Sequence, residues 1–82
     1  MSSPEDRQEA LEEHGLTETQ DGFVLSLRGF RKAAQRARAL RDQGDQEAAR
    51  MLALDPDDPV RWEYARCVQI EAFHDEWYES EF

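Results

Sequence analysis

One stretch decides the fold of this chain: Phe23-Val-Leu-Ser-Leu-Arg-Gly-Phe-Arg-Lys-Ala-Ala-Gln-Arg-Ala-Arg-Ala-Leu-Arg41. It holds six of the ten basic residues and no acidic residue, whereas all nineteen carboxylates lie on either side of it. The sequence therefore predicts a basic helix at the centre of a small acidic domain. That helix faces either the carboxylates of its own chain or a partner outside it.

A β-hairpin is predicted over residues 16–28. Asp21-Gly22 lies between two β-prone runs, and Asp-Gly in that setting is among the strongest short-range signals for a hairpin turn. Phe23, Leu25 and Leu27 then share one face of the second strand. Because an isolated two-stranded hairpin is only marginally stable in water, we expect this face to pack on helices.

The next segment has the pattern of an amphipathic helix over about residues 30–43. Its apolar side chains recur at three- and four-residue spacing and form one arc: Phe30, Ala33, Ala34, Ala37 and Leu40. On a helical wheel, Arg31 and Arg38 lie on one flank of this arc, and Lys32 and Arg36 lie on the other. The small alanines allow a neighbouring element to approach closely.

We expect three further helices, at about residues 4–14, 45–54 and 59–79, followed by a frayed tail at 80–82. Ser3 and Asp58, each followed by proline, are typical of helix starts, and Gly15 is typical of a helix end. The spacing around Gly44 has two interpretations. One is a break, with Asp45 capping a short helix, and the other is a single long helix that bends at Gly44.

Together these elements predict an α+β fold. We expect a single small domain over residues 1–82 with the order α-β-β-α-α-α, in which the hairpin packs on helices and a long C-terminal helix carries most of the aromatic residues. A chain of this length buries about two-thirds of the surface that it exposes when unfolded, so we expect modest stability. Self-association is one way in which so short a chain gains stability.

The composition indicates a cytoplasmic protein. Its single cysteine excludes an internal disulfide and suits a reducing compartment. No apolar run approaches the roughly 20 residues that span a bilayer, and the first residues lack the pattern of a secretory signal, so we expect no membrane contact. Low aliphatic bulk with a net charge of −9 is typical of a salt-adapted proteome, in which acidity serves solubility, and nine arginines against one lysine are typical of a high-GC genome. In an ordinary cytoplasm the same charge repels nucleic acid.

The sequence predicts no catalytic, cofactor or metal site. Glu71-x-x-His74 places a carboxylate and an imidazole on one helical face, as in half of a di-metal site, but one such pair binds no metal tightly. Cys67 lies within the apolar arc of the last helix, so we expect a buried and inert thiol. The chain has no glycine-rich phosphate loop and no Ser/His/Asp arrangement. We therefore expect a protein that is not an enzyme and needs no cofactor.

Two sets of residues are candidates for contact with a partner. The C-terminal helix has more apolar surface than one neighbouring helix covers, and Trp62, Phe73 and Trp77 are candidates for the face of a homodimer. Four cations of the central helix are candidates for contact with an acidic partner or with phosphates: Arg31, Lys32, Arg36 and Arg38. The leading hypothesis is a small acidic interaction protein that binds a protein partner or a second copy of itself.

Two other functions stay open. One is mimicry of nucleic acid by the carboxylates, toward a basic partner. The other is binding of nucleic acid, for which residues 10–34 carry a partial pattern: Gly15-Leu16, then the Asp21-Gly22 hairpin, then Leu25-Ser26-x-x-Gly29. This pattern resembles the wing region of winged-helix transcription regulators, in which the recognition helix ends at Gly-Leu, a hairpin wing follows, and a Leu-Ser/Thr-x-x-Gly turn opens the next helix.

The match to that family is incomplete. Only one short helix precedes the hairpin, whereas a complete winged helix has two or three, and that helix is acidic where a groove-reading helix is basic. The resemblance therefore implies a shared helix–hairpin–helix pattern, with a wing-like hairpin and the basic helix as the elements that would contact nucleic acid.

The basic helix also has a structural interpretation. Its arginines can pair with Glu and Asp side chains of the first and last helices, each exposed pair contributing about 0–1 kcal/mol. We expect this pairing, with the basic helix held between acidic helices as the structural centre of the domain. The arginines that stay unpaired at the surface are those available to a partner.

Overall fold

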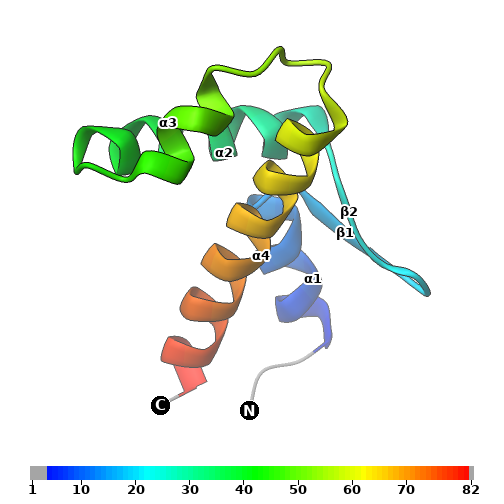
Figure 1. Ribbon diagram of the computed structural model, residues 1–82. Helices are drawn as coiled ribbons and strands as arrows, with labels where there is room; N and C mark the ends of the chain where they lie inside the picture. Colours follow the sequence, from blue (N-terminus) through cyan, green and yellow to red (C-terminus); the bar gives the residue numbers. More distant parts are fainter. Residues whose placement is uncertain (1–3, 82) are drawn as a thin grey trace.

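The computed structural model describes residues 4–81, and their side chains as far as Trp77 (Figure 1). The elements follow in the order α1 (Pro4–Glu13), β1 (Leu16–Thr19), β2 (Gly22–Leu25), α2 (Leu27–Asp42), α3 (Gln46–Leu52) and α4 (Pro59–Glu81). The predicted α+β class and the order α-β-β-α-α-α are therefore confirmed. The predicted cap at Ser3 and the last residue of the predicted tail, Phe82, lie outside the described residues.

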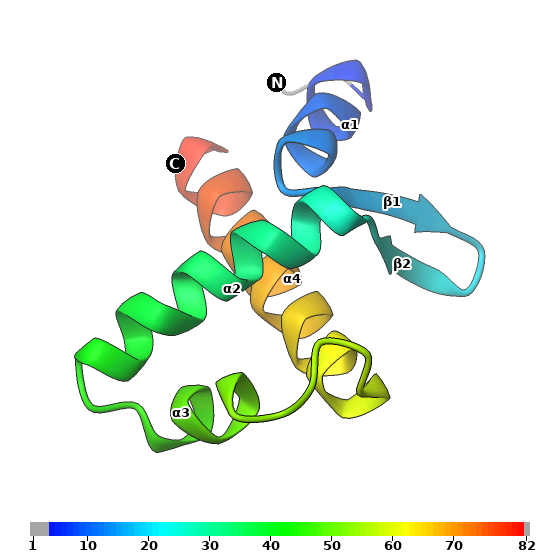
Figure 2. The same ribbon diagram turned by 90° about the horizontal axis from the view of Figure 1, so that it is seen from above.

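The other elements are arranged around α4. In Figure 1 it runs down most of the length of the molecule, with α1 beside its C-terminal half. Figure 2 shows α2 crossing over α4, with α3 alongside the C-terminal half of α2. Both strands contact α4 as well, so the hairpin packs on a helix as predicted.

The hairpin turn lies one residue earlier than the sequence pattern predicts. β1 and β2 pair antiparallel with Thr19 opposite Gly22, so the turn residues are Gln20 and Asp21 rather than Asp21 and Gly22. The Thr19 hydroxyl donates to the Gly22 carbonyl at 3.1 Å and accepts from the Asp21 N–H at 3.3 Å, which closes the turn. Gly22 has a φ of 125°, a conformation that favours glycine as the first residue of β2.

The helix α2 begins at Leu27, three residues before the predicted start at residue 30. Ser26 is the N-cap: its hydroxyl oxygen accepts from the Gly29 N–H at 3.1 Å, and its carbonyl accepts from the Phe30 N–H at 2.9 Å. This cap ends the strand, so Leu27 does not join the apolar face of the hairpin and is 57% exposed. The prediction that Leu27 packs with that face is therefore wrong.

The end of α1 packs on the start of α2, backbone against backbone. Gly15 closes α1 with a φ of 72°, and its carbonyl accepts from the N–H and the hydroxyl of Ser26, at 2.9 and 3.0 Å. A Cβ atom on Gly15 would lie 2.2 Å from the Cα of Gly29, and a Cβ on Gly29 would lie 2.7 Å from the Gly15 carbonyl oxygen. Both positions therefore require glycine. We call Gly15, Ser26 and Gly29 the glycine junction.

The last carbonyls of α1 are bound by side chains of two other helices. The His14 carbonyl accepts from Nε2 of Gln69, which is 2% exposed, at 2.8 Å. The Glu13 carbonyl accepts from the ammonium group of Lys32. Because a buried amide is costly without a partner, the first of these bonds fixes where α4 crosses the end of α1.

The core consists of two clusters along α4. One joins α2 to the first half of α4 and consists of Phe30, Ala33, Ala65 and Val68. The other joins α1 and the hairpin to the second half of α4 and consists of Leu11, Leu16 and Phe73. The apolar arc predicted for the central helix is confirmed as its buried face, with Ala33 and Ala37 only 1% and 2% exposed.

The remaining boundaries follow the predicted signals. Gly44, with a φ of 97°, separates α2 from α3, and Asp45 caps α3 by accepting from the Ala48 N–H at 3.0 Å, so the break is confirmed. Asp58 caps α4 through its carboxylate. This helix continues to Glu81, two residues beyond its predicted end. Within the described part of the chain, no helix is long and apolar enough to cross a membrane.

We predict that Gly29→Ala lowers the free energy of unfolding by about 1–3 kcal/mol, the usual cost of forcing a methyl group into a packed site. Helix propensity alone gives the opposite sign, because alanine is the better helix former by about 1 kcal/mol. Urea unfolding followed by circular dichroism measures the change. Ala39→Gly, at an exposed position of the same helix, is the matched control for propensity. A stabilised Gly29→Ala variant would contradict the close backbone contact.

Candidate functional site

The outward side of α2 carries a row of arginines. Because Phe30, Ala33 and Ala37 are buried against other elements, the side chains on the opposite side of the helix point to solvent. The exposed arginines there are Arg28, Arg31, Arg36 and Arg38. We call these four residues the basic face. The sequence has no acidic residue between Gly22 and Arg41, so no neighbour along the helix neutralises them.

The predicted pairing of this helix with carboxylates of the first and last helices is wrong. Among the side chains that the structure describes, which end at Trp77, no carboxylate of α1 or α4 forms an ion pair with α2, and Arg41 pairs with its own neighbour Asp42 at 3.7 Å. The reason is geometric. α2 turns its alanine arc toward α4, which places the basic face on the side away from the carboxylates of α4.

Two arginines outside α2 bind the hairpin, one through an ion pair and one through a backbone carbonyl. Arg7 of α1 donates to both carboxylate oxygens of Glu18 in β1, at 2.7 and 2.8 Å, and these hydrogen bonds lower the pKa of Glu18 below its ordinary value. Arg66 of α4 pairs with Glu63, lowers the pKa of that carboxyl through its hydrogen bond, and donates to the Phe23 carbonyl at 3.2 Å. These contacts stabilise the hairpin and leave the basic face unpaired.

Lys32 has a structural partner rather than an outward position. It is half-buried, and its ammonium group donates to the backbone carbonyl of Glu13 at the end of α1. A cation there also interacts favourably with the negative end of the helix dipole. Of the four residues predicted to contact a partner, Arg31, Arg36 and Arg38 are exposed, whereas Lys32 joins α2 to the end of α1.

A groove opens on one flank of the basic face, next to the start of α4. It has a volume of about 300 Å³ and is lined by Phe30, Arg31, Ala34, Gln35, Arg38 and Arg61. We call it the arginine groove. Three of its six lining residues carry a guanidinium group and none is acidic. The arrangement can therefore bind an anion.

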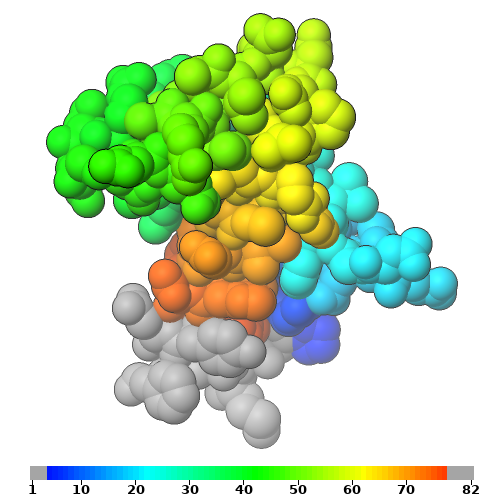
Figure 3. Space-filling view, viewed as in Figure 1, coloured from blue at the N-terminus to red at the C-terminus, as the bar shows by residue number. Residues whose placement is uncertain are grey.

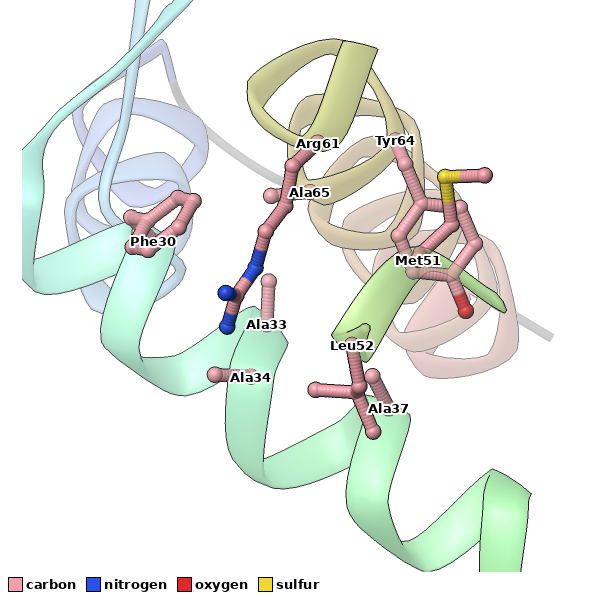
Figure 4. Close-up of a pocket in the computed structure, with 9 residues that line it drawn as sticks. All are labelled: Phe30, Ala33, Ala34, Ala37, Met51, Leu52, Arg61, Tyr64 and Ala65. Atoms are coloured by element: carbon pink, nitrogen blue, oxygen red, sulfur yellow. The ribbon is translucent and has the colours of Figure 1, made fainter. Parts of the chain in front are cut away.

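Arg61 is the groove residue that the sequence reasoning missed. Its guanidinium donates to the Leu54 carbonyl at 2.9 Å and lies 5.3 Å from the centroid of the Phe30 ring. Figure 4 shows this side chain reaching from α4 toward α2. Because only the crossing of the two helices brings it to the same groove as Arg31 and Arg38, no spacing in the sequence signals it.

An apolar pocket lies between α2, α3 and α4 (Figure 4). Its free volume is about 10 Å³, which is room for at most one water molecule. Met51 and Leu52 of α3 cover the alanine arc there, together with Tyr64 of α4. Burial raises the pKa of Tyr64, and nearby carboxylates add to this effect. The pocket is therefore a packing contact and not a ligand site.

The three aromatic residues predicted for a homodimer face lie in two separate places. Phe73 is 1% exposed and belongs to the core. The half-buried Trp62 stacks on Phe30, with 4.2 Å between ring centroids, and its Nε1 donates to the Pro56 carbonyl at 2.7 Å. The half-buried Trp77 stacks on Phe73 at 5.9 Å. The apolar surface of α4 is thus covered within the chain, by α2 along its first half and by α1 and the hairpin along its second half. Self-association itself stays a prediction.

The cysteine of α4 lies at the surface, so the expected burial of its thiol is wrong. Cys67 is exposed because it lies one turn from Glu63 and one turn from Glu71, on the polar side of the helix. Desolvation by neighbouring side chains raises the pKa of Cys67, and the charge of Glu63 raises it further. A raised pKa keeps the thiol protonated and poorly nucleophilic at neutral pH.

The spaced pair Glu71 and His74 is also exposed. The His74 ring packs edge-on against Phe23, with 6.4 Å between ring centroids. In the stretch that the structure describes, no group of three or more Cys, His, Asp or Glu side chains is placed to hold a metal ion.

Comparison with family models, curated proteins and solved structures gave no match. The candidate site therefore rests on the geometry of α2 and α4. The resemblance to a wing region rests on the order α1, β1, β2, α2 and on the cap that Ser26 forms with Gly29.

We predict that Lys32→Ala and Arg36→Ala differ in their effect on stability. Lys32→Ala removes the donor to the Glu13 carbonyl and is expected to lower the free energy of unfolding by about 0.5–1.5 kcal/mol. Arg36→Ala removes an exposed side chain that pairs with no carboxylate among the described residues, and is expected to change stability by no more than about 0.5 kcal/mol. Urea unfolding measures both values, and equal losses would contradict this division of roles.

Proposed function

We propose that this chain is a non-enzymatic interaction protein that binds an acidic segment of a partner protein through the basic face of α2. The observation that supports the proposal is the exposure of Arg28, Arg31, Arg36 and Arg38 without carboxylate partners in the described structure. An arginine held at the surface keeps its donors free, and its planar guanidinium binds carboxylates through paired hydrogen bonds.

The distribution of charge favours a partner of limited size. Six basic residues lie between Phe23 and Arg41, whereas nineteen acidic and four basic residues make up the charge of the rest of the chain. The 16 residues of α2 give a helix about 24 Å long. A partner that covers only this helix is attracted, and one that extends over the neighbouring elements meets carboxylates.

Exposed apolar side chains at the start of α2 and on the strand before it favour a protein over a polyanion. Leu27 is 57% exposed and lies one turn before Arg31 on α2. Val24, on the outward side of β2, is 54% exposed. Protein interfaces combine apolar contacts at the centre with charged residues at the rim. The surface therefore suits an acidic segment that also carries apolar side chains.

Binding of nucleic acid is the second candidate. The outer part of the hairpin projects from the rest of the molecule (Figure 3), and β2 leads directly into α2, which is the position of a wing. The charge of α1 opposes this function. Its exposed acidic residues are Glu5, Asp6, Glu9, Glu12 and Glu13. The end of α1 packs on the start of α2 at the glycine junction, which is also where the hairpin joins α2. A duplex lying along α2 would bring its phosphates near these carboxylates.

A binding assay with two probes separates the candidates. The probes are a fluorescein-labelled peptide that alternates glutamate and leucine, and a labelled 20-base-pair duplex. We expect the peptide to bind at low salt, to lose affinity as salt rises, and to lose it at least about tenfold when all four arginines of the basic face are replaced by glutamine. Arg50→Gln, at an exposed position of α3, is the control and is expected to leave the affinity within about twofold.

Two outcomes would overturn the proposal. Peptide affinity that does not change in the fourfold variant would show that the basic face is not the contact. Duplex DNA that binds more tightly than the peptide would favour the wing-like function instead. Anisotropy titrations at two salt concentrations give all of these values.

A further inference from the structure

The arginine groove combines a concave shape with an excess of positive charge. Arg31 and Arg38 lie seven residues apart on the same flank of α2, a separation of about 10.5 Å along the helix axis. Arg61 enters the groove from α4, and the other lining groups are an amide, a phenyl ring and a methyl group. Three like charges repel one another in such a groove unless an anion joins them.

Arg61 is held in position before any ligand binds. Its donation to the Leu54 carbonyl and its contact with the Phe30 ring fix the guanidinium group. Arginine has five N–H donors, so the bond to one carbonyl leaves others for a ligand. A cation that is already ordered loses little conformational entropy on binding, which raises the affinity of the site.

The charge of the groove selects among anions. A carboxylate carries one negative charge and a phosphate monoester about 1.5 to 2 at neutral pH, so a diphosphate group, with about three, best balances three guanidinium groups. We infer that the arginine groove binds the diphosphate group of a small organic diphosphate. Its volume of about 300 Å³ is at the lower end of the range for small-molecule sites.

The rest of the ligand finds little specific recognition in the groove. The Phe30 ring is stacked on Trp62 and contacts the Arg61 guanidinium, so it is not free to stack on an aromatic ligand. What is left beside the arginines is the Ala34 methyl group and the Gln35 amide. The diphosphate is therefore the recognised part. The groove shares Arg31 and Arg38 with the basic face, but the inference does not rest on the proposed binding of an acidic protein, because it is argued from the concave shape and from Arg61, which lies outside that face.

Isothermal titration calorimetry of the full chain with inorganic pyrophosphate tests the inference. We expect pyrophosphate to bind at least tenfold more tightly than inorganic phosphate or succinate, because only pyrophosphate carries about three charges in one compact group. Arg61→Gln and Arg38→Gln are each expected to weaken binding at least tenfold. Arg36→Gln, which removes the same charge from the other flank of α2, is the matched control and is expected to change the affinity less than twofold.

Two groove variants are used because one of them can affect folding. Arg61→Gln also removes a bond to Leu54, so circular dichroism must show that it folds, whereas Arg38 is exposed and serves as the second variant. Equal weakening by Arg36→Gln and Arg38→Gln, or equal affinity for phosphate and pyrophosphate, would show attraction of counterions only and overturn the inference. Binding of the acidic peptide is expected to fall in Arg36→Gln and to persist in Arg61→Gln, so failure of the groove and failure of the proposed function are separate results.

Discussion

The contact between Gly15 and Gly29 is the constraint on which the rest of this structure depends. A Cβ atom on Gly15 would lie 2.2 Å from the Cα of Gly29, so the end of α1 and the start of α2 approach too closely for a side chain to lie between them. The Gly15 carbonyl accepts from both donors of Ser26, and the same serine caps α2. One short segment therefore ends the hairpin, begins the central helix and holds the first helix against it.

The placement of charge follows from that junction. Once α2 is fixed at its first turn, its alanine arc packs on α4, and its arginines point away from the core. The ion pairs among the described side chains do not involve the arginines of the basic face: Arg7 pairs with Glu18, His14 with Glu76, Arg66 with Glu63, and Arg41 with Asp42. The proposed functions therefore rest on a result of packing. The alanine side of α2 is buried against its neighbours, so the arginines on its other side are exposed and form no ion pair with a described carboxylate.

Local patterns in the sequence were sufficient for most of the fold. Turn and cap residues such as Gly44 and Asp45 act on their own neighbours, and the apolar arc of α2 depends on helical periodicity, so both could be predicted. The start of α2 was misplaced because Leu27 fits a strand as well as a helix, and the capping bond of Ser26 decides between them. Ion pairs and the groove depend on which faces meet, which explains why Arg61 had no signal in the sequence.

The most direct test of this account is the hydrogen exchange of the Ser26 amide, measured by NMR. Its N–H donates to the Gly15 carbonyl at 2.9 Å within the junction. If the junction holds the fold together, this amide exchanges only on global unfolding, with the same protection as the amide of Phe73 in the core, whereas Asp21 in the hairpin turn exchanges rapidly. Exchange of Ser26 as fast as that of Asp21 would contradict the account.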